Sequence, residues 1–147
     1  MDRPVRKGLP HAVPQWVEDR DPFFITINCQ PRGQNHFCNA VGDEVLAAAK
    51  FNHEKGVWNC RLMLLMPDHL HAVIIFSRSV GLQTTVSNWK KYVARTLGVE
   101  WQKDFFDHRL RDERALEEKV SYILMNPVRK GLCERVEDWR WVFRGVR

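Results

Sequence analysis

The sequence predicts an α+β fold, a ferredoxin-like β-α-β-β-α-β sandwich with an antiparallel central sheet, followed by one C-terminal helix. Three observations predict it. Apolar runs of strand composition occupy residues 23–29, 57–66, 69–76 and 105–111. Helical patterns lie between these runs at 40–52 and 81–98, and again after the last one at 113–125. The resulting order is strand, helix, strand, strand, helix, strand and a further helix. This fold hosts many functions, so the order alone decides none.

The first strand and the first helix are defined by composition. F-F-I-T-I-N-C (23–29) is short, aromatic and β-branched, as strands are. P-R-G-Q-N (31–35) has the residues of a loop. Residues 40–52 are rich in alanine and favour a helix.

The next two strands form a hairpin. The runs 57–66 and 69–76 are almost entirely apolar and are separated only by Pro67 and Asp68. Their continuous hydrophobicity predicts that both lie at the centre of the sheet, covered on both sides.

Glycines at 81 and 98 bracket the second helix. Its apolar residues recur at helical spacing and predict one buried stripe, formed by Val86, Trp89, Val93 and Leu97. We expect Lys90, Lys91 and Arg95 on the other faces of this helix, where they can contact solvent or phosphate.

The strand at 105–111 ends before Asp112, a typical N-cap for the third helix at 113–125. The apolar stripe of this helix consists of Leu116, Val120, Ile123 and Leu124. We expect Asn126-Pro127 and then Gly131 to end the helix.

Length and composition indicate a single domain covering 1–147, with an irregular arm at 1–22 and a C-terminal tail at 128–147. The chain is 44% apolar and 28% charged. The N-terminus has no apolar run typical of a signal peptide, and no stretch is long enough to span a bilayer. Four cysteines without metal-binding spacing (Cys29, Cys38, Cys60 and Cys133) indicate reduced thiols in a cytoplasmic protein.

The charge balance favours a polyanionic partner. Lysine and arginine outnumber aspartate and glutamate by 23 to 18, and the net charge is +5. Basic proteins of this kind often contact nucleic-acid phosphates, although charge alone does not separate that partner from a solvated surface.

Two histidines stand out in the apolar hairpin. His69 and His71 are one residue apart on a predicted strand, so their side chains project from the same face. They could be structural histidines that bond to backbone carbonyls at a turn, or they could share a divalent ion. The second alternative would offset the desolvation of two buried imidazoles.

The third helix adds a tyrosine and an amide. Tyr122 lies away from the centre of the apolar stripe, and Asn126 follows one turn later on the same side. Alone, this pair would be a half-exposed tyrosine and an ordinary helix ending. Its combination with a histidine pair on the sheet that the helix must cover indicates a catalytic site.

The motifs together resemble a known family. P-D-H-L-H-A-V-I-I-F, W-Q-K-D-F-F-D-H-R-L-R and Y-I-L-M-N-P-V-R-K-G-L followed by D-W-R-W are similar, in order and spacing, to the REP-associated tyrosine transposases. The N-terminal L-P-H and F-F-I-T-I-N extend the similarity over nearly the whole chain. These enzymes are HUH single-tyrosine transposases, where HUH denotes histidine-hydrophobic-histidine.

The resemblance implies a metal-dependent endonuclease and strand transferase that acts on single-stranded or hairpin DNA. Tyr122 matches the nucleophile, and His69, His71 and Asn126 match the metal-binding positions. The expected metal is Mg²⁺ or Mn²⁺, whose chemistry suits two imidazoles and an amide completed by phosphate and water. It also implies a cytoplasmic, nucleoid-associated protein without a membrane anchor, either a monomer or a homodimer.

Further residues are candidates for DNA contacts. The cations are Lys90, Lys91, Arg95, Arg109, Arg111, Arg129 and Lys130, and by analogy with the family's N-terminal arm Arg3, Arg6 and Lys7. Each could equally be a solvated charge. His108 lies in a D-H-R motif usual in this family, with a structural or an accessory role.

Two alternatives remain. A non-catalytic ferredoxin-like nucleic-acid-binding protein would carry stacking aromatics on its central strands, whereas these carry mainly aliphatic residues and histidine. A replication initiator or relaxase would share the HUH chemistry, but such proteins are generally longer. Tyr92, the only other tyrosine, is a weaker nucleophile candidate because Thr96, not an amide, follows it one turn later.

Overall fold

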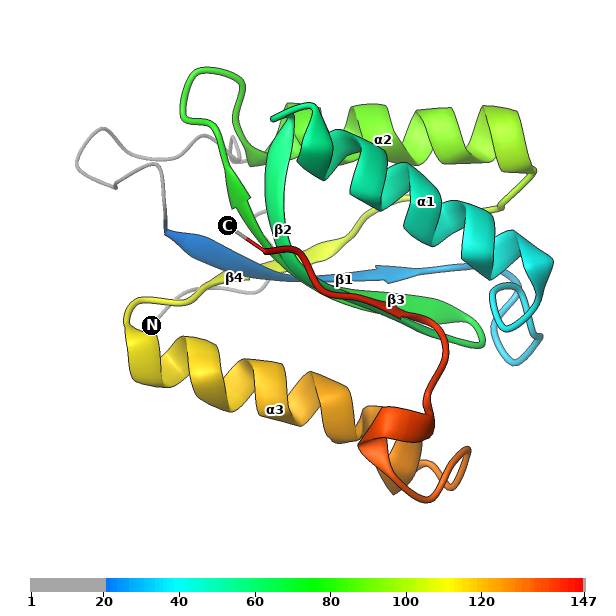
Figure 1. The fold of residues 1–147 in the computed structure, drawn as a ribbon. Coiled ribbons are helices and arrows are strands. Elements are labelled where there is room, and N and C mark those ends of the chain that lie inside the picture. Colours follow the sequence, from blue (N-terminus) through cyan, green and yellow to red (C-terminus); the bar gives the residue numbers. More distant parts are fainter. Residues whose placement is uncertain (1–20, 147) are drawn as a thin grey trace.

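The computed structural model describes residues 21–146 and shows three helices against a five-stranded sheet (Figure 1). The predicted arm at 1–22, with Arg3, Arg6 and Lys7, lies almost entirely outside the described residues. In chain order the elements are β1 Pro22–Asn28, α1 Ala40–Glu54, β2 Trp58–Met66, β3 His69–Phe76, α2 Leu82–Leu97, β4 Phe106–Arg109, α3 Glu113–Arg129, the 3₁₀ turn η1 Val136–Asp138, and β5 Val142–Phe143.

The sheet has the strand order β4-β1-β3-β2-β5, and every neighbouring pair is antiparallel. The first four positions are those of the ferredoxin-like arrangement, so the predicted fold class is confirmed. Helices α1 and α2 cover one face of the sheet, and α3 covers the other (Figure 1). The fifth strand was not predicted; it comes from the C-terminal tail.

Alternation along the strands divides the interior into two cores. On β3, Leu70, Ala72 and Ile74 belong to the core beneath α1 and α2. Val73 belongs to the core beneath α3, and so do Phe24 on β1 and Ile123 on α3 itself. Because successive side chains of a strand point to opposite faces, His69 and His71 lie on the α3 side.

The helix ends follow local sequence signals. Asn39 caps α1, with its side-chain oxygen accepting from the Val41 N–H at 2.8 Å. Asp112 caps α3 as predicted, accepting from the Ala115 N–H at 2.8 Å. Gly98, at φ +75°, ends α2 in the left-handed conformation that glycine adopts without strain.

The predicted end of the third helix is wrong. Helix α3 does not stop at residue 125 but continues through Pro127 to Arg129. Proline lacks only its own N–H, so the helix loses one backbone bond there. The next turn is closed by the Lys130 N–H, which donates to the Asn126 carbonyl at 3.0 Å. Two other predicted boundaries also shift, since β4 is shorter than 105–111 and α1 continues beyond residue 52.

The C-terminal tail is part of the fold. Val142 and Phe143 pair with Leu64 and Met63 on β2. Just before this strand, the buried Trp139 donates its indole N–H to the Leu65 carbonyl at 3.0 Å. Within residues 21–146, no helix has both the length and the apolar composition needed to cross a bilayer.

Replacing Trp139 with alanine should destabilise the protein by about 3–5 kcal/mol, the usual cost of removing a buried tryptophan. Urea unfolding followed by circular dichroism would measure the change. The matched control is Val146→Ala, because that side chain is 87% exposed. Equal stability of the two variants would show that the tail is not anchored through Trp139.

Candidate active site on the α3 face

The predicted histidine pair lies on the central strand. His69 and His71 project from the α3 face of β3, with ring centroids 4.9 Å apart and ring planes at 77°. Each side chain is largely but not completely covered. The two imidazoles are therefore close enough to bind one ligand together.

A hydrogen bond fixes each imidazole at its Nδ1 atom. His71 Nδ1 lies 2.9 Å from the hydroxyl of Thr26, its register partner on β1. His69 Nδ1 lies 2.9 Å from a carboxylate oxygen of the preceding Asp68. When Nδ1 carries the proton, Nε2 carries a lone pair that can bind a metal ion or accept a hydrogen bond.

Asp68 is held in its charged form by several donors. Although partial burial opposes ionisation, hydrogen bonds from Arg32, Gly33 and His69 hold the pKa of the Asp68 carboxyl well below its usual range. The Arg32 Nε and Gly33 N–H donate to it at 2.9 and 2.7 Å. The Asp68 carboxylate therefore stays ionised at neutral pH, where it accepts a hydrogen bond from His69 Nδ1 and orients the ring.

Both histidines are neutral at physiological pH. Burial, aided by repulsion from a protonated His69 and from the positive charges of Lys119 and Arg129, lowers the pKa of His71 to about 3. Burial also lowers the pKa of His69, although Asp68 partly opposes this effect. A neutral imidazole is the form that coordinates a metal.

Tyr122 presents its side chain on α3, where it is 52% exposed. Two cations contact its ring. The Lys119 ammonium lies 5.0 Å from the ring centroid, and the Arg129 guanidinium carbon lies 4.2 Å from it. Arg129 also donates to the Tyr122 carbonyl at 3.0 Å, which fixes this cation beside the tyrosine.

Lys119 and Phe24 connect the tyrosine to the histidines. The Lys119 ammonium lies 4.4 Å from the centroid of the Phe24 ring. That ring stacks on His71, with centroids 5.5 Å apart and an interplanar angle of 26°. The nucleophile candidate and the histidine pair therefore belong to one continuous set of contacts on the α3 face.

Asn126 is buried to 6% exposure, one turn after Tyr122. The donor set of two imidazole nitrogens and one amide oxygen fits Mg²⁺ or Mn²⁺ with an open coordination sphere. The described part of the chain holds no cluster of three His, Cys, Asp or Glu side chains that could bind a metal ion.

Two of the candidate phosphate contacts, Lys90 and Arg109, are buried and not exposed as expected. Lys90 is buried, not solvent-facing, and its ammonium donates to the carbonyls of Gln102 and Lys103 at 3.0 and 3.2 Å. Arg109 is also buried, and it lies opposite Phe23 on the side of β4 that faces away from α3. Both cations support the fold, and neither is presented to a DNA strand at the histidines.

The other candidates separate by face. Arg129 and Lys130 are exposed at the end of α3, close to the histidines, whereas Lys91 and Arg95 are exposed on α2, across the sheet. Arg111 is exposed just before α3. His108 lies on the α3 side of β4 opposite Phe24, so strand β1 separates it from the histidine pair. Tyr92 is on α2 and cannot serve the site on the α3 face.

Three residues of the site were not predicted, although the sequence carries a signal for each. Lys119 precedes Tyr122 by three residues, the spacing that brings side chains together on a helix. Phe24 and Thr26 alternate with core residues along β1, which places both on one face. Only the strand register shows that this face carries His71.

The neutral state of His71 has a pH-dependent consequence. Its folded pKa, about 3, is below its unfolded value of 6.5. Between these values the unfolded chain binds a proton that the folded chain excludes, so stability falls as the pH is lowered and is unaffected above 6.5. The slope of the unfolding free energy against pH should therefore be smaller in metal-free His71→Gln than in metal-free wild type, by about 1.4 kcal/mol per pH unit. Urea unfolding of both proteins between pH 4 and 6 measures it, and identical slopes would contradict a neutral, buried His71.

Comparison with known proteins identifies two relatives that are named as REP-associated tyrosine transposases. No family model matches the chain. It is 31% identical over 122 residues to the REP-associated tyrosine transposase of Escherichia coli, covering 80% of this chain and 72% of that protein. It is 26% identical over 135 residues to a Haemophilus influenzae protein named "Putative REP-associated tyrosine transposase", covering 80% of this chain and 76% of the relative.

A solved structure has the same fold. It is a REP-associated tyrosine transposase bound to a REP hairpin, and it superposes with a TM-score of 0.74 at 20% identity. The match covers 88% of this chain and 80% of that one. The sequence relationship to the Escherichia coli protein and this shared fold agree with the motifs described above: the chain belongs to the family of REP-associated tyrosine transposases.

Proposed function

We propose that this transposase-family chain is a metal-dependent single-strand DNA endonuclease and strand transferase that cleaves at or near hairpins through a 5′-phosphotyrosine. One observation carries the proposal. The chain of contacts from His71 through Phe24 and Lys119 to Tyr122 puts a nucleophile, cations and neutral imidazoles on one face of the sheet. The related transposase whose structure is solved binds a REP hairpin, which supports hairpin DNA as the substrate.

Different residues of the site have different roles in the proposed phosphoryl transfer. Lys119 and Arg129, beside the Tyr122 ring, attract a phosphate and balance its charge. The Nε2 atoms of His69 and His71, with the side-chain oxygen of Asn126, would hold a divalent ion. Such an ion polarises a scissile phosphate and stabilises its developing charge. Asp68 and Thr26 keep the two rings in the orientation that this role requires.

The covalent step is an exchange of phosphodiester for phosphotyrosine. The Tyr122 hydroxyl oxygen attacks the scissile phosphorus, and the bond from phosphorus to the 3′-oxygen of the preceding nucleotide breaks. The phenolic proton ends on that 3′-oxygen, which leaves as a free hydroxyl. The new bond retains the energy of the old one, so a 3′-hydroxyl can later attack it and restore both the tyrosine and a DNA strand without ATP.

The alternative function, a non-catalytic protein that binds nucleic acid on its sheet, is disfavoured because helices cover both faces of that sheet. Base stacking on a ferredoxin-like sheet needs an open face with aromatic side chains. Here α1 and α2 cover one face and α3 covers the other (Figure 1). Phe24, the aromatic residue nearest the histidines, is buried against His71.

Tyr122→Phe should abolish covalent attachment to DNA, because phenylalanine keeps the ring and its contacts with cations but has no nucleophilic oxygen. The measurement is a denaturing gel with labelled single-stranded hairpins, ideally the repeats flanking the gene, in Mn²⁺, in Mg²⁺ and with EDTA. We expect an adduct that requires the metal and is absent from the variant. Tyr92→Phe is the matched control, since its ring is similarly exposed on the other face. Adduct formation by Tyr122→Phe would refute the assignment.

Lys119→Gln should slow adduct formation by about 100- to 1000-fold, the range observed when one charge-stabilising donor is lost. Glutamine keeps the length and helix propensity of lysine and removes only the charge. The exposed Lys50 on α1, which pairs with Glu54, provides the control Lys50→Gln. Single-turnover rates at saturating DNA measure the effect. Equal rates in wild type and Lys119→Gln would show that this ammonium does not act on the phosphate.

A further inference from the structure

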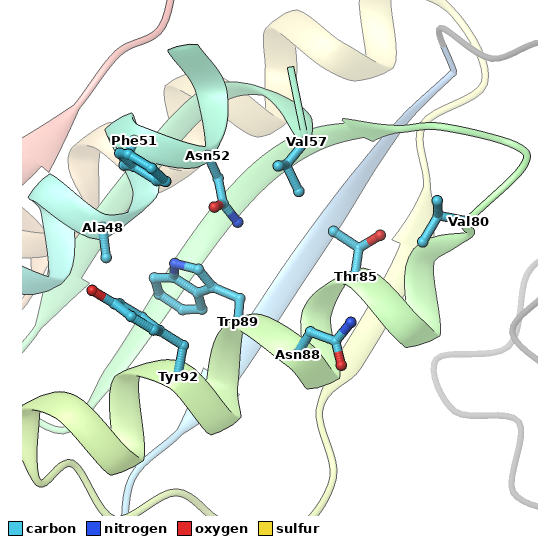
Figure 2. A pocket seen from close by; sticks show the side chains of 9 residues that line it. All are labelled: Ala48, Phe51, Asn52, Val57, Val80, Thr85, Asn88, Trp89 and Tyr92. Carbon is cyan, nitrogen blue, oxygen red and sulfur yellow. The ribbon is translucent and has the colours of Figure 1, made fainter. Parts of the chain in front are cut away.

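A cavity of about 440 Å³ lies between α1 and α2, on the face of the sheet opposite the histidines (Figure 2). Phe51 and Asn52 of α1 line it from one side, and Trp89 and Tyr92 of α2 line it from the other. Its size is within the range of sites that bind small planar molecules. The proposed chemistry of Tyr122 makes no use of it.

The aromatic side chains of this cavity are unusually accessible. Phe51 is 58% exposed and Tyr92 is 48% exposed, although both are large apolar residues. Val57 and Val80, at 43% and 54%, extend the same apolar surface. Exposed apolar residues that gather around a hollow, and are not scattered singly, mark a binding site.

Polar groups without partners complete the lining. Within the described residues, the buried indole N–H of Trp89 has no hydrogen-bond acceptor. Figure 2 shows the Asn52 amide directed toward this indole, and Asn88 on the adjoining turn of α2. Asparagine amides donate and accept at once, which is the pattern that pairs with the edge of a nucleobase.

Positive charge borders the aromatic end of the cavity. The Lys55 ammonium lies 5.7 Å from the Phe51 ring centroid. Arg95 follows Tyr92 by three residues on α2, the spacing that brings side chains together on a helix, and it is exposed. These cations are too far around the fold to serve the histidines, but they flank the place where a base in the cavity would carry its phosphates.

We propose that the cavity between α1 and α2 is a second nucleic-acid site, which binds an unpaired nucleobase of single-stranded DNA between Phe51 and Tyr92. The base stacks on the aromatic rings, and the Asn52 and Asn88 amides bond to its edge. Lys55 and Arg95 bind the adjoining phosphates. The inference rests on the proposed function only in taking DNA as the polymer.

The test compares two labelled oligomers of equal length, a single-stranded oligodeoxyadenylate and an abasic deoxyribose-phosphate chain. Fluorescence anisotropy with EDTA present measures affinity without cleavage. Wild type should bind the base-containing oligomer more tightly. Tyr92→Ala and Phe51→Ala should weaken that binding by roughly 5- to 150-fold, the range that stacking on an aromatic contributes. The two side chains are 48% and 58% exposed, so the variants should fold.

Leu132→Ala is the control, since that exposed residue lies just beyond α3. Equal affinity of wild type for the two oligomers, or unchanged affinity in both cavity variants, would overturn the inference. A dimer that either variant dissociates, seen by sedimentation, would also overturn it and make the cavity an interface between copies. Adduct formation at saturating DNA should persist in Tyr92→Ala. Base-selective binding by a wild type that forms no adduct would instead refute the proposed function alone.

Discussion

The burial of strand β3 on both faces is the constraint around which this structure is arranged. It is the third strand of five, and helices cover the sheet on both sides. Leu70, Ala72 and Ile74 meet this constraint with apolar side chains alone. His69 and His71 cannot, so each imidazole needs a polar partner within reach. Thr26 on β1 and Asp68 in the turn provide those partners, and burial then keeps both rings neutral.

Helix α3 packs against the face of the sheet that carries His69 and His71, and the length of this helix determines where Arg129 lies. Had it ended before Pro127, nothing would fix the position of Arg129 relative to Tyr122. The helix continues instead, and Arg129, seven residues after the tyrosine, returns to the same side two turns later. Its guanidinium both covers the Tyr122 ring and bonds to the Tyr122 carbonyl. Continuation through the proline therefore places a fixed cation beside the nucleophile candidate.

The features that depend on local periodicity could be predicted from the sequence. The features that depend on tertiary contacts could not. Alternation on β3 was sufficient to place His69 and His71 on one side, and the order of elements was sufficient for the sheet. Lys90 shows where local periodicity is insufficient, because helical spacing alone predicts that it lies on an exposed face of α2. In the structure its long apolar stem is buried, and its ammonium reaches the carbonyls of Gln102 and Lys103 in the following loop. Likewise, nothing local shows that Val142 and Phe143 pair with β2 about eighty residues earlier in the chain.

Exposed cations lie on both faces of the sheet in this chain, whose net charge is +5. Lys119, Arg129 and Lys130 belong to the α3 side, while Lys91 and Arg95 belong to α2. At one end of the sheet, the Cys29 N–H donates to the Asp68 carbonyl in the turn before His69, and Cys29 forms a β-bridge with Trp101, shortly after α2 ends. The two proposed DNA sites therefore lie on opposite faces of one sheet, and the strand order, not the net charge, sets that arrangement.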